Sequence, residues 1–402
     1  MVKKFLLLFL YVLSLTLNAH AAEFVTPNHR VDTRLIIRSN SSASSTEIGE
    51  LRHGDRLPYI QSVPWWHEVQ FDNGITGFVS KGYSTVVDIP ASVANDELRL
   101  HFLAVGAGSC TLIECPGTNS TPMLVDCGSH WTTTSKTRNT PAEAQQYIQN
   151  ILSNYNNRVN LVTSHADFDH YTYIPTVLSN IQVLNYWMGG DEADYSSGDY
   201  PNFLANLRSS GTNIHTNIGS YHTPLDTPEP TLSCGNANTY VLTHKAGNTK
   251  NSGSLVLLIE NGDFTVVITG DATGDTEDAI INNYNSIIKA TVISASHHGS
   301  STHQSNSQPW IKNVQPNAVI YSSGQNFQHP RCVSVNRYHE HLSVAPTHQV
   351  QCDSTASSIT VDSSLAEYMT EASGTVVIRS NGRSPFFVSC EEDTGCNGAI
   401  NH

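Results

Sequence analysis

The chain has 402 residues and carries 35 aspartate and glutamate residues against 21 lysine and arginine residues, which gives a formal net charge of −14. An acidic chain repels polyanions at long range, which counts against a simple nucleic-acid-binding protein. Its length exceeds what one hydrophobic core usually supports, so we expect two domains.

Residues 1–21 are typical of a secretory signal peptide. Lysines precede an apolar run from Phe5 to Leu17, and the small residues Ala19 and Ala21 suit a signal peptidase that cuts after them. A membrane anchor is the alternative, but the run is shorter than the ~20 residues that a spanning helix needs. No later stretch of the sequence is long and apolar enough to span. We therefore expect a secreted protein, periplasmic or extracellular, with no membrane span in the mature chain.

Residues 30–88 combine short β-rich runs with turn signals, and an Asn-Gly pair between "WWHEVQF" and "ITGFV" predicts a hairpin. The run Leu35–Arg38, the turn "IGELRHGD", the paired tryptophans and "GITGFVSKGY" follow the order of the bacterial SH3-type domain, which this segment resembles. The resemblance implies a small all-β barrel that binds a cell-wall or peptide ligand. Trp65 and Trp66 can equally pack in the core and at the barrel rim without a ligand.

Residues 89–97 have the composition of a linker, with proline, serine, asparagine and acids but no hydrophobic periodicity. In residues 98–389, short apolar strands such as "LRLHFLAVG" and "FTVVITGD" are mixed with predicted helices such as "PAEAQQYIQNILSNY". This mixture predicts an α+β fold in which helices cover layers of sheet. Residues 188–238 are rich in glycine, serine and asparagine and indicate an insertion or lid. Residues 390–402 are expected to form a C-terminal tail.

The chain has eight cysteines, and export makes disulfides chemically possible. Two pairs are predicted because each would close a polar loop. Cys110 and Cys127 lie in apolar strand patterns and are expected to be buried thiols. The rest of the connectivity does not follow from the sequence. The predicted pairs are Cys390 with Cys396 and Cys332 with Cys352.

The segment "TSHADFDHYT" contains four side chains of the types that bind metals, directly after the apolar run "VNLVTS". Two imidazoles and two carboxylates so close together would repel one another or stay protonated without a cation, and a divalent metal resolves both problems. A solvated acidic turn is the alternative, but two histidines behind an apolar strand count against it. The four residues are His165, Asp167, Asp169 and His170.

Further candidate ligands follow later strands. Asp271 comes directly after "VVITG", a position where it can also be a turn residue or a helix cap. His297 and His298 follow "VISAS", and adjacent histidines at a strand end would otherwise need separate hydrogen-bond partners. Three strand ends therefore offer ligands to one edge of a sheet, which is the usual place for an active site in layered folds.

In chain order, these motifs resemble the metallo-β-lactamase superfamily. The segments "VGAGSCTLIECP", "MLVDCG", "SHADFDH", "NSGSLVLLIENGDFTVVITGD", "SASHHGS" and "AVIYSSGQNFQHP" are most similar to the hydrolase domain of the ComEC DNA-uptake proteins. Those proteins carry His-x-Asp-x-Asp-His and His-His-Gly-Ser in this order. The resemblance implies that residues 98–389 form an αββα sandwich with a two-metal site.

The resemblance also implies which side chains hold the ions. One of the two adjacent histidines would bind metal; we assign His297 to the metal and His298 to catalysis. The first ion would take His165 and Asp167, the second would take Asp169, His170 and one of the adjacent histidines, and Asp271 would bridge the two.

Two positions depart from the commoner superfamily pattern. Asp167 stands where a second histidine is usual, and a further histidine near Asn251 is missing. Asn251 or water would therefore complete the coordination of the first ion. Oxygen ligands make the site harder and shift its preference from zinc toward manganese or magnesium. The expected cofactors are two divalent ions, manganese, magnesium or zinc.

These features predict a secreted metal-dependent hydrolase, and the oxygen-rich ligand set favours a phosphodiesterase or nuclease in which two ions activate a water. Asp169 would orient that water, and His298 and His329 would donate hydrogen bonds to the substrate, although His329 can equally be a surface loop histidine. The expected substrate is a phosphodiester, including DNA. The alternatives are a hydrolase of a lactone or β-lactam, and a non-catalytic cell-wall-binding protein.

Overall fold

The computed structural model describes residues 22–402 apart from residues 29, 32–33, 52–55, 72–73, 90–96, 131–138, 217, 219–222, 226–227, 230–231, 285–287, 325–326 and 355–356. The predicted signal peptide lies outside the described residues, and so does most of the predicted linker. None of the helices in the described ranges combines the length and the apolar character that crossing a bilayer requires.

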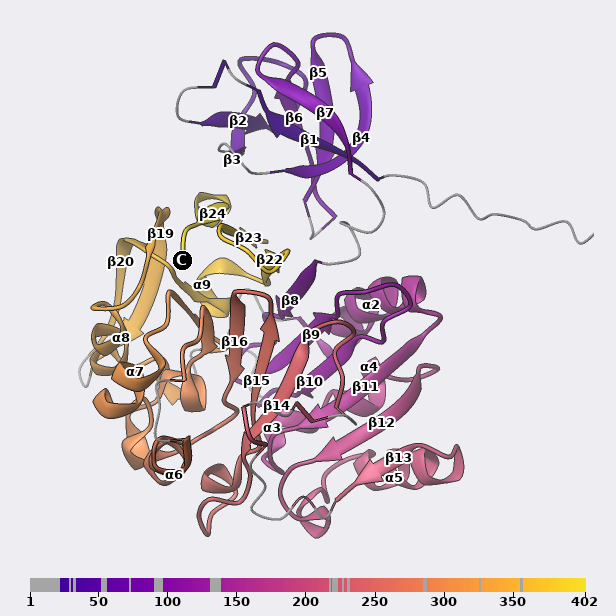
Figure 1. Ribbon diagram of the computed structural model, residues 1–402, viewed down its shortest axis with the longest axis vertical. Coiled ribbons are helices and arrows are strands. Elements are labelled where there is room, and N and C mark those ends of the chain that lie inside the picture. The colour runs from indigo at the N-terminus through magenta and orange to yellow at the C-terminus, as the bar shows by residue number, and fades with distance from the viewer. Residues whose placement is uncertain are drawn as a thin grey trace, which may run out of the picture.

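An all-β region comes first in the chain and lies at the top of Figure 1. Its seven strands form one sheet in the order β3-β2-β6-β5-β4-β1-β7, and β5 and β6 are the antiparallel strands of the predicted hairpin. Ile37, Val69 and Val79 are fully buried in its own small core. Trp65 stays 83% exposed between β4 and β5, so it does not pack into that core. The strands are β1 (Ala22–Pro27), β2 (Leu35–Arg38), β3 (Glu47–Leu51), β4 (Leu57–Val63), β5 (Trp66–Gln70), β6 (Thr76–Ser80) and β7 (Ser84–Ile89).

A nine-stranded mixed sheet follows, in the order β13-β12-β11-β10-β9-β8-β22-β23-β24. The strands from β10 to β13 are parallel, and the other neighbours are antiparallel. β13 lies within residues 188–238, so part of the predicted insertion supplies an edge strand. The strands are β8 (Leu98–Phe102), β9 (Cys110–Glu114), β10 (Met123–Cys127), β11 (Arg158–Thr163), β12 (Gln182–Met188), β13 (Asn213–His215), β22 (Val376–Ser380), β23 (Phe386–Cys390) and β24 (Gly398–Ile400).

A six-stranded sheet has the order β14-β15-β16-β17-β18-β21, and β19 and β20 form a separate hairpin. The strands from β16 to β21 in this sheet are parallel. Their bounds are β14 (Asn238–Thr243), β15 (Val256–Asn261), β16 (Phe264–Ile268), β17 (Val292–Ser294), β18 (Ala318–Tyr321), β19 (Val344–Asp353), β20 (Ser358–Leu365) and β21 (Glu367–Met369).

The two larger sheets pack against each other through one shared core. Ile113 and Val125 of the nine-stranded sheet belong to it, and so do Leu257 and Val266 of the six-stranded sheet. Side chains alternate along a strand, so the neighbouring Leu112 faces the opposite way, into a core shared with helices. Because both faces are covered, these strands have almost continuous apolar sequences.

Helices cover the outer face of each sheet (Figure 1). Helices α2 to α5 share a core with β9 to β12, and α6 to α8 share another with β14 to β18. An all-β region followed by a mixed α/β region confirms the predicted fold class at this level. The helices are α2 (Pro141–Leu152), α3 (Phe168–Tyr171), α4 (Ile174–Val177), α5 (Tyr200–Ser209), α6 (Gly274–Tyr284), α7 (Gln308–Val314), α8 (Cys332–Tyr338) and α9 (Thr370–Ser373), with 3₁₀ turns η1 (Ser153–Tyr155), η2 (Glu192–Asp194), η3 (Asn251–Gly253), η4 (Ser296–Gly299), η5 (Thr302–Gln304) and η7 (Thr394–Cys396).

The eight cysteines form four disulfides, and both predicted pairs are confirmed. The expectation of free thiols at Cys110 and Cys127 is wrong, because these residues lie directly opposite each other on the antiparallel strands β9 and β10 and are bonded. The apolar pattern places both residues in buried strands but does not show that the strands pair in this register. The four disulfides are Cys110–Cys127, Cys115–Cys234, Cys332–Cys352 and Cys390–Cys396.

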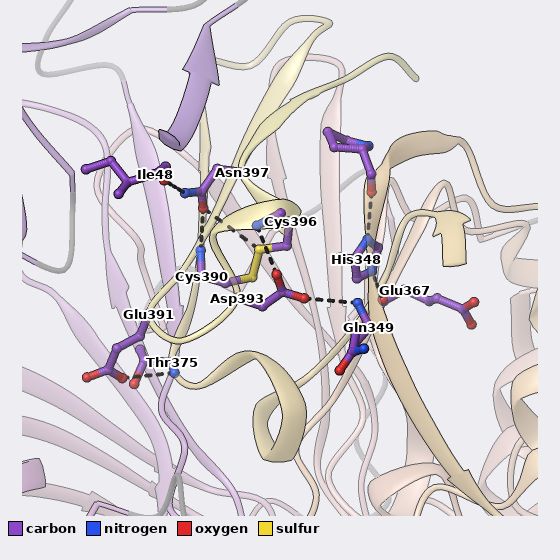
Figure 2. Close-up of a disulfide and its surroundings, with 12 residues drawn as sticks. Ile48, His348, Gln349, Glu367, Thr375, Cys390, Glu391, Asp393, Cys396 and Asn397 are labelled. Carbon is purple, nitrogen blue, oxygen red and sulfur yellow. Dashed lines mark hydrogen bonds between the residues drawn. A yellow bond between two sulfur atoms is a disulfide. The ribbon is translucent and has the colours of Figure 1, made fainter. Parts of the chain in front are cut away.

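Residues 390–402, expected to form a tail, belong to the nine-stranded sheet and contact the all-β region. β24 pairs with β23, and Ile400 is buried in the shared core. Asn397 joins the two parts of the chain (Figure 2): its Oδ1 accepts the backbone N–H of Cys390 at 2.8 Å, and its Nδ2 donates to the carbonyl of Ile48 in β3 at 3.4 Å.

Candidate metal centre

The candidate ligands lie in loops at the carboxyl ends of parallel strands from both large sheets. His165, Asp167, Asp169 and His170 follow β11, where the short helix α3 turns the chain immediately after the strand. Asp271 follows β16, and the adjacent histidines lie in η4 after β17. The carboxyl ends of these strands face one region of the molecule, so loops distant in sequence meet there.

Asp271 lies between two sets of imidazoles. Its Oδ1 is 3.0 Å from His170 Nε2 and 3.3 Å from His298 Nε2. Its Oδ2 is 3.8 Å from His165 Nε2 and 3.5 Å from His297 Nε2. One carboxylate therefore presents a separate oxygen to each set.

The remaining two acids each face one set. Asp167 Oδ2 lies 3.5 Å from His165 Nε2, and Asp169 Oδ2 lies 3.4 Å from His298 Nε2. Two groups have ligand atoms that all lie within 4.8 Å of one another: His165, His170 and Asp271, and Asp169, His170 and His298.

The structure places His298, rather than His297, with Asp169. The Nδ1 of His298 donates to the backbone carbonyl of Ser322 at 2.7 Å, which fixes the ring and directs Nε2 toward the cluster. Such a hydrogen bond from the far nitrogen is the usual support of a metal-binding histidine. His297 instead lies between Asp271 and Asn251, whose Nδ2 is 3.4 Å from His297 Nε2.

The donor set fits a divalent cation. The Nε2 atoms of His165, His170 and His298 and the Oδ1 of Asp271 are buried without a hydrogen-bond partner in the part of the chain that the structure describes. Buried polar atoms almost always have partners, so four that converge on one place need an explanation. A cation bound by imidazole and carboxylate supplies it, since manganese, iron and zinc all accept such mixed ligands.

Without a cation, the cluster retains protons. Burial lowers the pKa of His170, but the carboxylates of Asp271 and Asp126 outweigh it and hold that pKa well above its ordinary value. Burial raises the pKa of Asp271, yet the charges of His170 and His298 hold it well below its ordinary value. A metal must displace a proton from an imidazole that binds it, so its apparent affinity falls as the pH falls.

Asp126 supports the cluster and was not recognised from the sequence. Its Oδ2 accepts the Nδ1–H of His170 at 2.8 Å, and it also accepts the backbone N–H and the hydroxyl of Ser164 at 2.6 and 2.7 Å. The residue is almost fully buried at the end of β10 and has a φ of 53°. The segment "MLVDCG" contains the only available signal, a buried acid at the end of an apolar strand.

Glu277 of α6 holds the loop that carries the adjacent histidines. This fully buried carboxylate accepts the backbone N–H groups of Asn306 at 2.7 Å and Ser307 at 2.9 Å. The Asn306 side chain in turn donates to two backbone carbonyls of the same loop. The loop needs such support because His297 and His298 have φ values of 50° and 56°, which residues other than glycine seldom adopt.

Replacing Glu277 by glutamine should weaken the pH dependence of stability. Burial raises the pKa of Glu277 from 4.5 to about 7. Between these values the folded protein holds a proton that the unfolded chain has lost, so the free energy of unfolding falls as the pH rises through this window, by roughly 3 kcal/mol for this group. Glu277→Gln cannot titrate. Urea unfolding in chelator from pH 4.5 to 8 should therefore show that the free energy of unfolding falls less for the variant than for the parent protein.

The exposed neighbour Asp278 provides the matched control on the same helix. Asp278→Asn should retain the pH dependence of the parent protein. Parallel curves for the parent protein and Glu277→Gln would show that Glu277 ionises in the folded state as it does in the unfolded chain.

Three other residues lie beside the cluster. The ring of His329 is 5.8 Å from that of His297, and burial, together with the nearby histidine charges, lowers the pKa of His329 to about 3. His329 is therefore neutral at physiological pH and lies close to the cluster. Lys250 Nζ is 3.6 Å from Asp167 Oδ1, and Asn251 follows it at the place where this chain lacks the further histidine of the commoner pattern.

Sequence comparison shows partial similarity to known proteins. Residues 33–85 match the family model described as the bacterial SH3 domain, which confirms that part of the prediction. Over 90 residues the chain is 37% identical to ComE operon protein 3 of Bacillus subtilis, covering 22% of this chain and 10% of that protein. Over 249 residues it is 26% identical to Recombination protein 2 of Haemophilus influenzae, covering 60% of this chain and 26% of that protein. The chain thus spans only a minor part of either relative.

Among solved structures, the chain is similar to CmlA, a diiron beta-hydroxylase from Streptomyces venezuelae. The sequences are 15% identical and the TM-score is 0.37, over 64% of this chain and 52% of that one. A mutant of the CmlA beta-hydroxylase gives the same identity and TM-score over 56% of this chain and 46% of that one.

Proposed function

We propose that this protein is a metal-dependent phosphodiesterase whose residues 98–389 form the αββα sandwich of the metallo-β-lactamase superfamily. The observation that carries the proposal is the position of Asp271, with one carboxylate oxygen facing each of two sets of buried histidine nitrogens. The order of the sequence motifs and the packing of two sheets between helices support the fold assignment. Residues 30–88 would form the SH3-like domain, residues 89–97 the linker, and residues 390–402 the C-terminal segment.

The proposed ligands follow from the distances. His298 replaces His297 as the preferred ligand of the second ion, because its Nε2 faces Asp169 and Asp271. His297 and Asn251 lie beside Asp271 Oδ2 and would complete the coordination of the first ion in place of the superfamily histidine. The first ion would be held by His165, Asp167 and Asp271, and the second by Asp169, His170, His298 and Asp271.

Bound divalent ions would supply Lewis acidity and lower the pKa of a water. Side chains of the protein would orient the water and bind the substrate. Asp169, whose Oδ2 lies 3.4 Å from His298 Nε2, would orient the attacking water. His329 is neutral and would exchange hydrogen bonds with the leaving group. Lys250, 42% exposed at its side chain, would attract the phosphate to the open side of the cluster.

We also propose a periplasmic or extracellular location. Four disulfides form and persist in an oxidising compartment, and the predicted signal peptide would deliver the chain there. The SH3-like domain would bind a cell-wall or peptide ligand, and the exposed Trp65 offers it a contact surface.

A substrate panel tests the proposal. The purified protein, its metal content measured, is assayed with bis-p-nitrophenyl phosphate, a lactone and a cephalosporin, each with manganese, magnesium or zinc. We expect about two ions per chain and hydrolysis of the phosphodiester that chelator abolishes. Turnover of the lactone or cephalosporin alone would replace the phosphodiesterase with a carbonyl hydrolase. A protein without bound metal or turnover would be a non-catalytic binding protein.

A further inference from the structure

Phe327 has an unusual environment beside the candidate metal centre. Among the described residues from 97 onward, it is the one phenylalanine, tyrosine or tryptophan side chain that stays exposed, at 45%. It lies in the segment after β18, which also contains His329. An exposed aromatic ring offers a face on which a planar group of a ligand can stack.

Phe327 belongs to a row of rings that begins at the candidate ligands. The ring of His329 lies 5.8 Å from His297 and 6.4 Å from Phe327. His130 then stands edge-on to Phe327 at 4.9 Å, with an angle of 87° between the ring planes. Phe168 lies 6.1 Å beyond His130, and its chain neighbours are the two aspartates of the cluster. The five rings come from four separate segments, so the row is a feature of the folded protein.

The two lysines within residues 245–250 are paired with acids, and Arg331, two residues after His329, donates to the amide oxygen of Gln328 at 2.9 Å. Lys245 Nζ lies 2.6 Å from Asp191 Oδ1, and Lys250 Nζ lies 3.6 Å from Asp167 Oδ1. The whole chain has a net charge of −14. This distribution disfavours a long polyanion, which depends on many unmatched lysines and arginines. Stacking on a flat ring is a recognition mode that needs none of them.

We propose that Phe327 is the platform on which a nucleobase stacks, and that the substrate is a small nucleoside phosphodiester whose base lies against Phe327 while its phosphate reaches the metal cluster. This inference rests on the proposed phosphodiesterase activity and adds the part of the substrate that binds outside the cluster. The exposed ring of Phe327 provides the flat surface, and the rings of His130 and His329 pack against it at an angle. The pairing of both lysines with acids leaves little charge to bind further phosphates.

Two esters with the same leaving group test the platform. Thymidine 5′-(p-nitrophenyl phosphate) and methyl p-nitrophenyl phosphate differ in one ester group, which is a nucleoside in the first and a methyl group in the second. We expect the parent protein to have a KM for the thymidine ester about tenfold lower, because stacking stabilises a base by about as much as a tenfold change in affinity requires. Phe327→Leu should remove this difference with little change in kcat, and Phe327→Trp, which restores a flat ring, should keep it.

A binding measurement separates the platform from the activity. Calorimetric titration of the metal-loaded protein with thymidine 5′-monophosphate should show affinity about tenfold weaker in Phe327→Leu than in the parent protein or in Phe327→Trp. Equal binding by all three proteins would overturn the platform, whether or not the esters are hydrolysed. An equal rise of KM for both esters would place the nitrophenyl ring on Phe327 and overturn the nucleobase. If neither ester is hydrolysed while the monophosphate binds through Phe327, the platform stands and the proposed activity fails.

Discussion

Replacing Asp271 by alanine is expected to abolish hydrolysis of a phosphodiester and to lower the metal content of the purified protein. Each oxygen of Asp271 faces a different set of histidine nitrogens, so the substitution removes a ligand from both proposed sites. Metal ions supply several kcal/mol of transition-state stabilisation, and about 1.4 kcal/mol is a factor of ten in rate, so we expect a fall of at least about a hundredfold.

The measurement pairs steady-state rates with metal analysis of the same preparations. Asp278→Ala, an exposed acid seven residues further along the chain, is the control and should retain the activity and metal content of the parent protein. Asp271→Ala that keeps both ions and more than about a tenth of the rate would contradict the bridging role.

Asp126→Asn should weaken metal binding by about 10-fold to 100-fold, the usual effect of losing the residue that supports a metal-binding histidine. The carboxylate accepts the Nδ1–H of His170 and both donors of Ser164. Asparagine tolerates the φ of 53° at this position better than most residues, so the backbone should persist while the charge is lost. The affinity is measured by competition with a chromogenic chelator.

The exposed Asp199 provides the control, as Asp199→Asn. Thermal unfolding in chelator should show that both variants remain folded, which separates a loss of metal affinity from a loss of the fold. If Asp126→Asn binds metal as tightly as the control, His170 does not depend on Asp126 for its orientation.

Local patterns predicted much of the fold and of the candidate site. Apolar runs gave the buried strands, because strands covered on both faces contain little else. The four ligand-type residues of "TSHADFDHYT" were visible because one loop after β11 carries them all. Asp271 and the adjacent histidines could be added because they follow strands, and strand ends converge at one edge of a sheet.

The features that the sequence did not reveal depend on contacts between distant segments. The disulfide between Cys110 and Cys127 requires the register of β9 against β10, which two apolar strands do not encode visibly. In the sequence Asp126 cannot be distinguished from any other buried acid at a strand end, because its contact with His170 exists only in the folded protein. The position of His298 with Asp169 follows from its hydrogen bond to Ser322, in a loop far along the chain.

The pairing of β8 with β22 has a consequence for the order of events in the cell. β8 (Leu98–Phe102) lies in the middle of the nine-stranded sheet, but its neighbour β22 (Val376–Ser380) leaves the ribosome only after β9 to β21 have done so. Until then the nine-stranded sheet lacks three of its strands, and the shared core lacks Val376, Ile378 and the residues that follow. Such non-local pairing folds slowly. We expect the nine-stranded sheet to remain unfolded until β22 to β24 are synthesised, a state that would suit the proposed export.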